Sequence, residues 1–172
     1  MKWRFAVKFL VTFGLLVMVW WATDFAQLYR KAALATVQVL SPVVNGWWLD
    51  YDQPGFTDPV VYLSGSRQLP MLLQLPALSI ALMPFISLVA ATPGLGWKRA
   101  VGTAVLGSVL CFAIHVSAIL VYPLVLDRPN VIKDTIGAFS GLVAFVLAPI
   151  GLWFVLTYRA LRSVWQLTLD PR

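Results

Sequence analysis

The sequence predicts an all-α integral membrane protein with four transmembrane helices in a single membrane domain, residues 1–172. Three observations carry this prediction: four long apolar stretches, a hydrophobic fraction of 60% and a charged fraction of only 12%. Soluble domains carry about 25% charged residues. The four stretches cover residues 5–22, 69–91, 100–125 and 136–158. A hydrocarbon core about 30 Å thick needs about 20 helical residues at about 1.5 Å each, so each stretch is long enough to cross it.

The basic residues indicate how the spans are oriented. Eight of the thirteen Lys and Arg residues, but only one of the seven Asp residues, fall on the side of the two termini. These eight bases are Lys2, Arg4, Lys8, Lys98, Arg99, Arg159, Arg162 and Arg172. Because short loops rich in Lys and Arg stay in the cytoplasm, both termini are expected to be cytoplasmic, in a bacterial inner membrane. The net charge of +6 then follows from topology, and the expected partner is the lipid bilayer rather than a nucleic acid.

Aromatic side chains gather where the spans are expected to end, because amphipathic rings prefer the headgroup zone. They are Trp3, Trp97 and Tyr158 at the inner interface, and Trp20, Trp21 and Tyr122 at the outer one. Residues 19–22 offer no pair of small residues spaced for signal peptidase. The first span is therefore expected to be an uncleaved anchor.

The extracytoplasmic segment, residues 23–68, is expected to contain an amphipathic helix and a small hairpin. Apolar residues recur at helical spacing over residues 25–44, and the Asn-Gly pair at residues 45–46 ends the helix. This helix is expected to lie along the membrane surface or to cap the helix bundle. Residues 47–51 and 60–63 have strand character and predict the two arms of the hairpin.

Cys111 and His115 are the residues of the spans that suggest chemistry. They are four positions apart, which places both side chains on one face of the third span. A thiol beside an imidazole is the arrangement of a thiolate nucleophile with its base. Arg128, just beyond the outer end of that span, is placed to stabilise developing negative charge. These three residues are the candidates for catalysis.

A structural interpretation of the same pair is favoured, so no catalytic residue is assigned. A lone Cys in an apolar helix is usually a small hydrophobic residue, and with only one Cys no internal disulfide forms. A lone His at membrane depth is costly unless a neighbouring helix supplies a hydrogen-bond partner. The candidate partners are Ser117, Ser140 and the carbonyl groups freed near Pro76, Pro84 or Pro149.

No metal or other cofactor is predicted. Asp50, Asp52 and Asp58 lack the spacing of a calcium-binding loop, and the chain contains no Glu, so a solvated loop is the expected state. Charged residues are missing from the interior of every span, which argues against an ion pump. A small carrier built by oligomerisation would have only Gln74, His115 and scattered Ser and Thr to line a pore.

The order of the expected elements resembles that of the exosortase and archaeosortase family of membrane transpeptidase-like proteins, over about residues 8–158. An anchor helix precedes an outer helical and hairpin segment, and a span opens after the stretch Leu-Ser-Gly-Ser-Arg-Gln-Leu at residues 63–69. A basic inner turn at residues 97–99, a third span, an outer loop and a last helix with basic residues complete the resemblance. The resemblance is one of layout, without a specific motif.

The resemblance implies a non-catalytic relative. The family's enzymes use a Cys near the start of the second of these spans, an Arg late in the next and a His before the last helix. The matching positions here, residues 64–69, 115–120 and 127–140, lack the Cys, the Arg and the His respectively. Cys111 and His115 lie in other elements. Such a relative would assist the sorting of exported proteins that carry carboxy-terminal anchor signals.

The expected function is therefore that of a non-enzymatic accessory subunit of the inner membrane, paired with an exosortase-type enzyme or another envelope-assembly protein. Its partner would contact residues 25–44, the Trp47-Trp48 hairpin and the glycine-lined faces of the last two spans. Two alternatives stay open: a divergent intramembrane Cys hydrolase or transpeptidase that uses Cys111, His115 and Arg128, and a small oligomeric transporter subunit.

Overall fold

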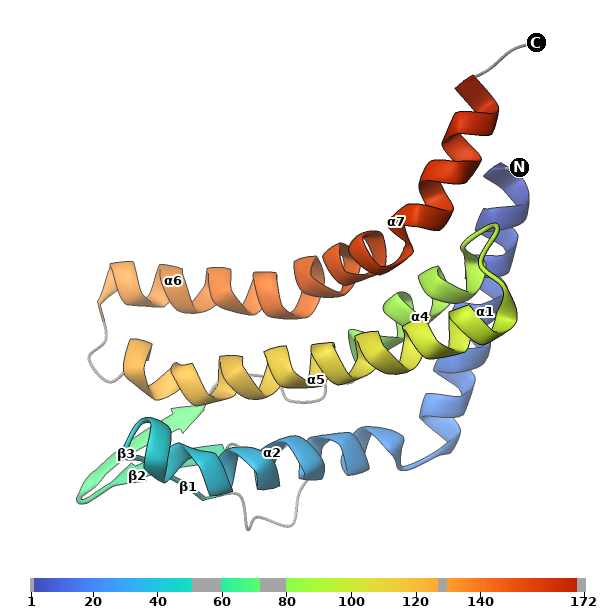
Figure 1. The fold of residues 1–172 in the computed structure, drawn as a ribbon. Helices are drawn as coiled ribbons and strands as arrows, with labels where there is room; N and C mark the ends of the chain where they lie inside the picture. The colour runs from blue at the N-terminus through green and yellow to red at the C-terminus, as the bar shows by residue number, and fades with distance from the viewer. Residues whose placement is uncertain (1, 51–59, 72–79, 127–129, 170–172) are drawn as a thin grey trace.

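The protein is built mainly from long helices (Figure 1). The computed structural model describes residues 2–50, 60–71, 80–126 and 130–169. About 81% of these residues are helical, and three of the helices formed by them are long and apolar enough to cross a membrane. The three are Trp3–Ala22, Trp97–Val125 and Val143–Arg162. The predictions of a mainly helical chain and of apolar helices long enough to cross a membrane are confirmed, the latter for three helices.

The described elements follow one another along the chain in the order helix, helix, three strands, and then helices to the end. They are α1 (Lys2–Ala22), α2 (Phe25–Val44), β1 (Trp48–Asp50), β2 (Val60–Ser64), β3 (Arg67–Met71), α4 (Leu82–Ala91), α5 (Trp97–Leu126), α6 (Val131–Leu142), the π-helix η1 (Val143–Leu147) and α7 (Ala148–Leu169). Helices α6, η1 and α7 form one continuous helical run that bends before its end (Figure 1).

The span expected at residues 69–91 is not confirmed as one membrane-length helix by the described residues. Its first residues belong to strand β3, and within the described part of the stretch the helix α4 has ten residues. Ten residues are about 15 Å long, roughly half of the hydrocarbon thickness. Pro84 lies in the first turn of α4, where a proline interrupts no hydrogen bond within that helix. Residues 72–79, with Gln74 and Pro76, lie outside the described ranges.

The expected hairpin is present and is extended by a strand that the sequence did not suggest. β1 pairs antiparallel with β2, with Trp48 opposite Leu63. β2 then turns at Gly65, whose φ of +59° suits glycine, and pairs antiparallel with β3. Apolar residues such as Leu69 fit a strand as well as a helix, which is why the run was assigned to the second span. The β1–β2 turn, residues 51–59, lies outside the described ranges.

Helix α2 ends where the sequence predicts. Asn45 is its C-cap residue, and Gly46 follows with a φ of +73°. The Asn45 Oδ1 atom accepts a hydrogen bond from the Trp47 backbone N–H at 2.9 Å, and the buried Ser41 hydroxyl donates to the Trp47 carbonyl at 2.7 Å. These two bonds turn the chain from α2 directly into the sheet.

Helices α1, α4, α5 and α7 pack together, with α4 in contact with each of the other three. Gly107 of α5 lets the Phe85 ring of α4 approach so closely that a Cβ atom at position 107 would overlap it. Trp153 of α7 donates from Nε1 to the Thr92 hydroxyl at the end of α4, at 2.9 Å, and its ring lies 6.5 Å from that of Phe5. The start of α1, the α4–α5 turn and the end of α7 lie toward one end of the molecule (Figure 1). Both termini can lie on one side of a membrane only if these segments share one end of the molecule. Which side that is stays a prediction.

The main buried cluster lies where α2 and the sheet meet α5. It consists of Ala33, Leu34, Val37, Trp47, Leu49, Val60, Tyr62, Val116, Ile119 and Leu120. α2 runs alongside α5 in Figure 1 and contributes its buried face to this cluster. The segment is thus a helix with the expected bounds, while its position relative to the bilayer stays a prediction.

Pro123 explains why the sheet is fastened to α5. A proline has no N–H, so the carbonyl of Ile119, four residues earlier, loses its helical donor. The buried Tyr62 hydroxyl of β2 donates to this carbonyl at 2.6 Å, and Asn45 Nδ2 donates to the neighbouring Leu120 carbonyl at 2.7 Å. The side chains of Tyr62 and Asn45 therefore supply hydrogen-bond donors to the carbonyl groups of α5 where Pro123 interrupts the helical bonding.

We expect Tyr62→Phe to lower the free energy of unfolding by about 1–3 kcal/mol, because it leaves the Ile119 carbonyl buried without a donor. In a Pro123→Ala background the new backbone N–H serves that carbonyl, so the same Tyr62→Phe change should cost clearly less. Chemical denaturation of the purified protein in detergent measures both costs. Tyr158→Phe, at an exposed tyrosine of α7, is the control. Equal costs in the two backgrounds would contradict the proposed role of Tyr62.

Candidate functional site

Cys111 and His115, the pair singled out by the sequence, lie on the face of α5 that packs against α2 and η1. The exposed fraction of the Cys111 side chain is 1%, and that of His115 is 0%. The spacing of the two residues therefore placed them correctly on one face. This face of α5 is buried inside the protein.

The Nδ1 atom of His115 lies 2.8 Å from the hydroxyl of Tyr29 on α2, within hydrogen-bond distance. The Tyr29 ring also meets Phe112 edge to face, with the ring centroids 5.5 Å apart. Among the partners expected for the imidazole, Ser117 is exposed, and the side chain of Ser140 is outside the described part of the chain. The partner on a neighbouring helix is instead Tyr29, which is not among the candidates that the sequence suggests. Its signal was its place among the periodic apolar positions of residues 25–44.

The other side of the imidazole faces the π-helix. The Phe145 ring lies 5.1 Å from the imidazole, centroid to centroid, and the backbone of Ala144 also interacts with the ring. In η1 the backbone N–H of Ala148 bonds to the carbonyl of Val143, five residues earlier. Continued by one residue, this register would pair Ala144 with Pro149, which has no N–H to donate. His115 therefore lies beside a carbonyl left without its helical donor.

This arrangement indicates where the protons of the Tyr29 hydroxyl and the His115 imidazole lie. With the Tyr29 hydroxyl donating to Nδ1, the proton of the neutral imidazole is on Nε2, on the side of the Ala144 backbone. Among the described residues, Nε2 meets no partner within standard hydrogen-bond geometry. Burial, and to a smaller extent the Cys111 thiol, raises the pKa of the Tyr29 phenol well above its ordinary value. Tyr29 thus stays protonated and donates a hydrogen bond at neutral pH.

The geometry fits helix packing better than nucleophilic catalysis. A catalytic thiol and its base need access for a substrate, and both side chains are closed off by α2 and η1. The tyrosine, rather than the thiol, lies within hydrogen-bond distance of the imidazole Nδ1. Arg128, the third candidate, lies outside the described residues. The catalytic assignment stays a prediction without geometric support.

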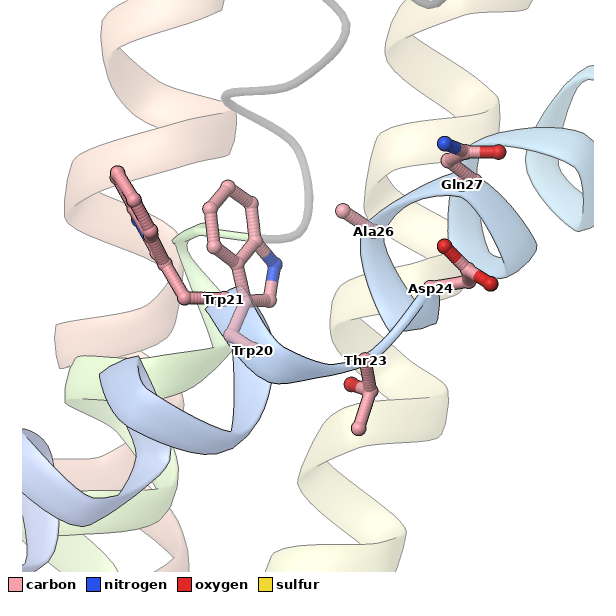
Figure 2. Close-up of a pocket in the computed structure, with 6 residues that line it drawn as sticks. All are labelled: Trp20, Trp21, Thr23, Asp24, Ala26 and Gln27. Atoms are coloured by element: carbon pink, nitrogen blue, oxygen red, sulfur yellow. The ribbon is translucent and has the colours of Figure 1, made fainter.

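Within the described ranges, no three His, Cys, Asp or Glu side chains gather closely enough to hold a metal ion. Asp50 is exposed on β1, while Asp52 and Asp58 lie in the part of the chain that is not described. A different feature, absent from the sequence-based predictions, is an open hollow of about 230 Å³ at the junction of α1 and α2 (Figure 2). It is lined by Trp20, Trp21, Thr23, Asp24, Ala26 and Gln27.

Comparisons with protein-family models, with curated proteins and with solved structures found no match to this chain.

We expect Tyr29→Phe to destabilise the protein by about 1–3 kcal/mol, because the buried Nδ1 of His115 then lacks a donor. The double variant Tyr29→Phe with His115→Leu removes both partners, so it should be more stable than the sum of the two single changes implies. Chemical denaturation in detergent gives the four free energies that this comparison needs. Strict additivity of the two substitutions would show that the pair is not coupled.

Proposed function

We propose that the chain is a non-enzymatic accessory subunit of a membrane complex in the bacterial inner membrane. The observation that carries the proposal is the structural use of the one Cys and His pair in the spans. His115 lies between Tyr29 and the π-helix, and Cys111 is buried beside it. The groups that would perform chemistry hold helices together instead.

Apolar surface on the outside of α2 supports a role in binding a protein partner. One face of α2 packs on α5, and on the outside Leu28, Val39 and Val43 are exposed by 65%, 74% and 87%. Trp48 on β1 is also exposed, whereas its neighbour Trp47 belongs to the buried cluster. The partner-facing surface is therefore the outer face of α2 together with Trp48, which we call the α2–Trp48 surface.

The glycine-lined faces contribute less to this surface than the sequence suggested. Gly107 is occupied by Phe85 within the same chain, as ordinary packing of α4 on α5. Gly102, one and a half turns earlier, has open space beside it and is available to another helix. A partner helix that packs on α5 would therefore approach at Gly102 and not at Gly107.

For the partner we propose an exosortase-type enzyme or another envelope-assembly protein. The layout resemblance supports this class: an anchor helix, an outer helical segment, an antiparallel strand pair and a last long helix follow in the family's order. An accessory subunit of this kind would present the α2–Trp48 surface to the enzyme and supply no reacting group.

We expect the full chain, expressed in its own host and extracted in mild detergent, to copurify with an integral membrane enzyme of this class. Trp48→Ala should reduce the recovered partner about tenfold, because a buried interfacial Trp is commonly worth 2 kcal/mol or more. Trp97→Ala, at another exposed Trp, on α5, should leave recovery unchanged. Mass spectrometry identifies and quantifies the partner. Recovery of the chain alone would contradict the proposal.

The hydrolase alternative makes the opposite prediction for Cys111. A buried packing thiol should react with a membrane-permeant maleimide at least tenfold more slowly than a cysteine introduced at Lys98, exposed in the first turn of α5. Cys111→Ser should retain the copurifying partner and any cellular function. Rapid labelling of Cys111, together with loss of function in the serine variant, would favour the hydrolase instead.

A further inference from the structure

One end of the molecule collects positive charge from three separate elements. The start of α1, the α4–α5 turn and the later part of α7 lie toward this end (Figure 1). Contacts between the elements hold them there: the Trp153 ring of α7 lies 6.5 Å from the Phe5 ring of α1, and its Nε1 donates to the Thr92 hydroxyl at 2.9 Å. The exposed bases that follow or flank these contacts, which we call the basic end, are Arg4, Lys8, Lys98, Arg99, Arg159 and Arg162.

The sequences of the same elements contain no acid to offset this charge. Neither α1, nor residues 92–99, nor α7 includes an Asp, and the chain has no Glu. Asp170, the acid expected on the side of the termini, lies outside the described residues. The fold therefore brings like charges toward one another, and the contacts of Trp153 with α1 and α4 keep them there. Such a surface attracts a partner whose negative charge is spread over a similar area.

Two exposed tryptophans indicate what kind of partner carries that negative charge. Trp3 at the start of α1 and Trp97 at the start of α5 are exposed by 78% and 76%. Both helices are long enough to cross a membrane, and tryptophans at the ends of such helices favour the layer of the lipid headgroups. The neighbouring bases Arg4 and Lys98 are then placed at the same depth. This depth favours lipid headgroups over a soluble acidic protein as the partner.

We propose that the basic end binds the headgroups of anionic phospholipids in the leaflet that it faces. Several headgroups share the surface, so no single phosphate has to reach bases on all three elements. A Lys or Arg near an anionic membrane surface strengthens binding by about fivefold, and the attraction falls off within a Debye length. The segments predicted to face the other side carry five bases and six Asp, so they should not show this preference. The proposal does not depend on the partner protein proposed above.

The test is the lipid selectivity of the purified full chain in phosphatidylcholine vesicles, measured with spin-labelled lipids by electron spin resonance. The fraction of each labelled lipid that the protein immobilises gives the relative affinity of that lipid. At about 10 mM salt we expect phosphatidylglycerol to bind about threefold or more tightly than phosphatidylcholine. At about 1 M salt the two affinities should become nearly equal, because the Debye length is then only about 3 Å.

Two double variants test whether the basic end causes the preference. Lys98→Gln with Arg99→Gln removes two of its six bases at the start of α5. Arg4→Gln with Lys8→Gln removes two others in α1. Each double variant should lower the preference for phosphatidylglycerol about twofold, because the attraction is shared among bases of separate elements.

Two controls separate an effect of charge from a loss of fold. Lys98→Arg with Arg99→Lys retains both charges and should retain the preference. Lys31→Gln with Lys133→Gln removes two bases of α2 and α6, away from the basic end, and should retain it as well. Equal affinity for the two lipids at low salt would overturn the proposal and would favour an acidic protein segment as the partner of this surface. A preference that either double variant leaves unchanged, or that the control pair lowers equally, would overturn it too.

Discussion

The carbonyl groups that proline frees inside long helices are the constraint on which this fold depends. Water satisfies such a group at a protein surface, but in a lipid environment only the protein itself can do so. Pro123 frees the Ile119 carbonyl, and Tyr62 and Asn45 supply donors at this point of α5. Because these donors come from β2 and from the end of α2, helix α2 and the sheet are both tied to α5.

Pro149 likewise leaves a carbonyl without its helical donor in the run formed by α6, η1 and α7. Three elements, η1, α5 and α2, meet near this carbonyl. The helix widens into η1, and His115 lies beside the backbone of Ala144, whose carbonyl the proline leaves without a donor. The hydroxyl of Tyr29 lies within hydrogen-bond distance of the imidazole Nδ1. His115 thus lies between the Tyr29 hydroxyl on α2 and the backbone of η1.

The sequence predicted those parts of the fold that depend on local requirements. The lengths of α1 and α5 follow from apolar runs that match the bilayer, and the end of α2 follows from Asn45 and Gly46. The residues of β3 were assigned to a span because pairing with β2 is a long-range contact that hydrophobicity does not encode. Tyr29 was missed for the same reason. Its partner lies 86 residues away, and periodicity predicts the buried face of a helix but not its neighbour.

Helix α2 is apolar on two faces, and only one of them is buried within the described part of the chain. One face is buried against α5 by the cluster around Ala33 and Val37, while Val39 and Val43 point outward. Lipid alone would cover the outer face if α2 lay at the depth of the acyl chains, but α2 also carries the exposed charge of Lys31. Placing Lys31 in hydrocarbon costs several kcal/mol unless its amine reaches the headgroups. The predicted membrane insertion therefore favours a position of Lys31 near the headgroups, and the α2–Trp48 surface is the contact that we propose for a partner.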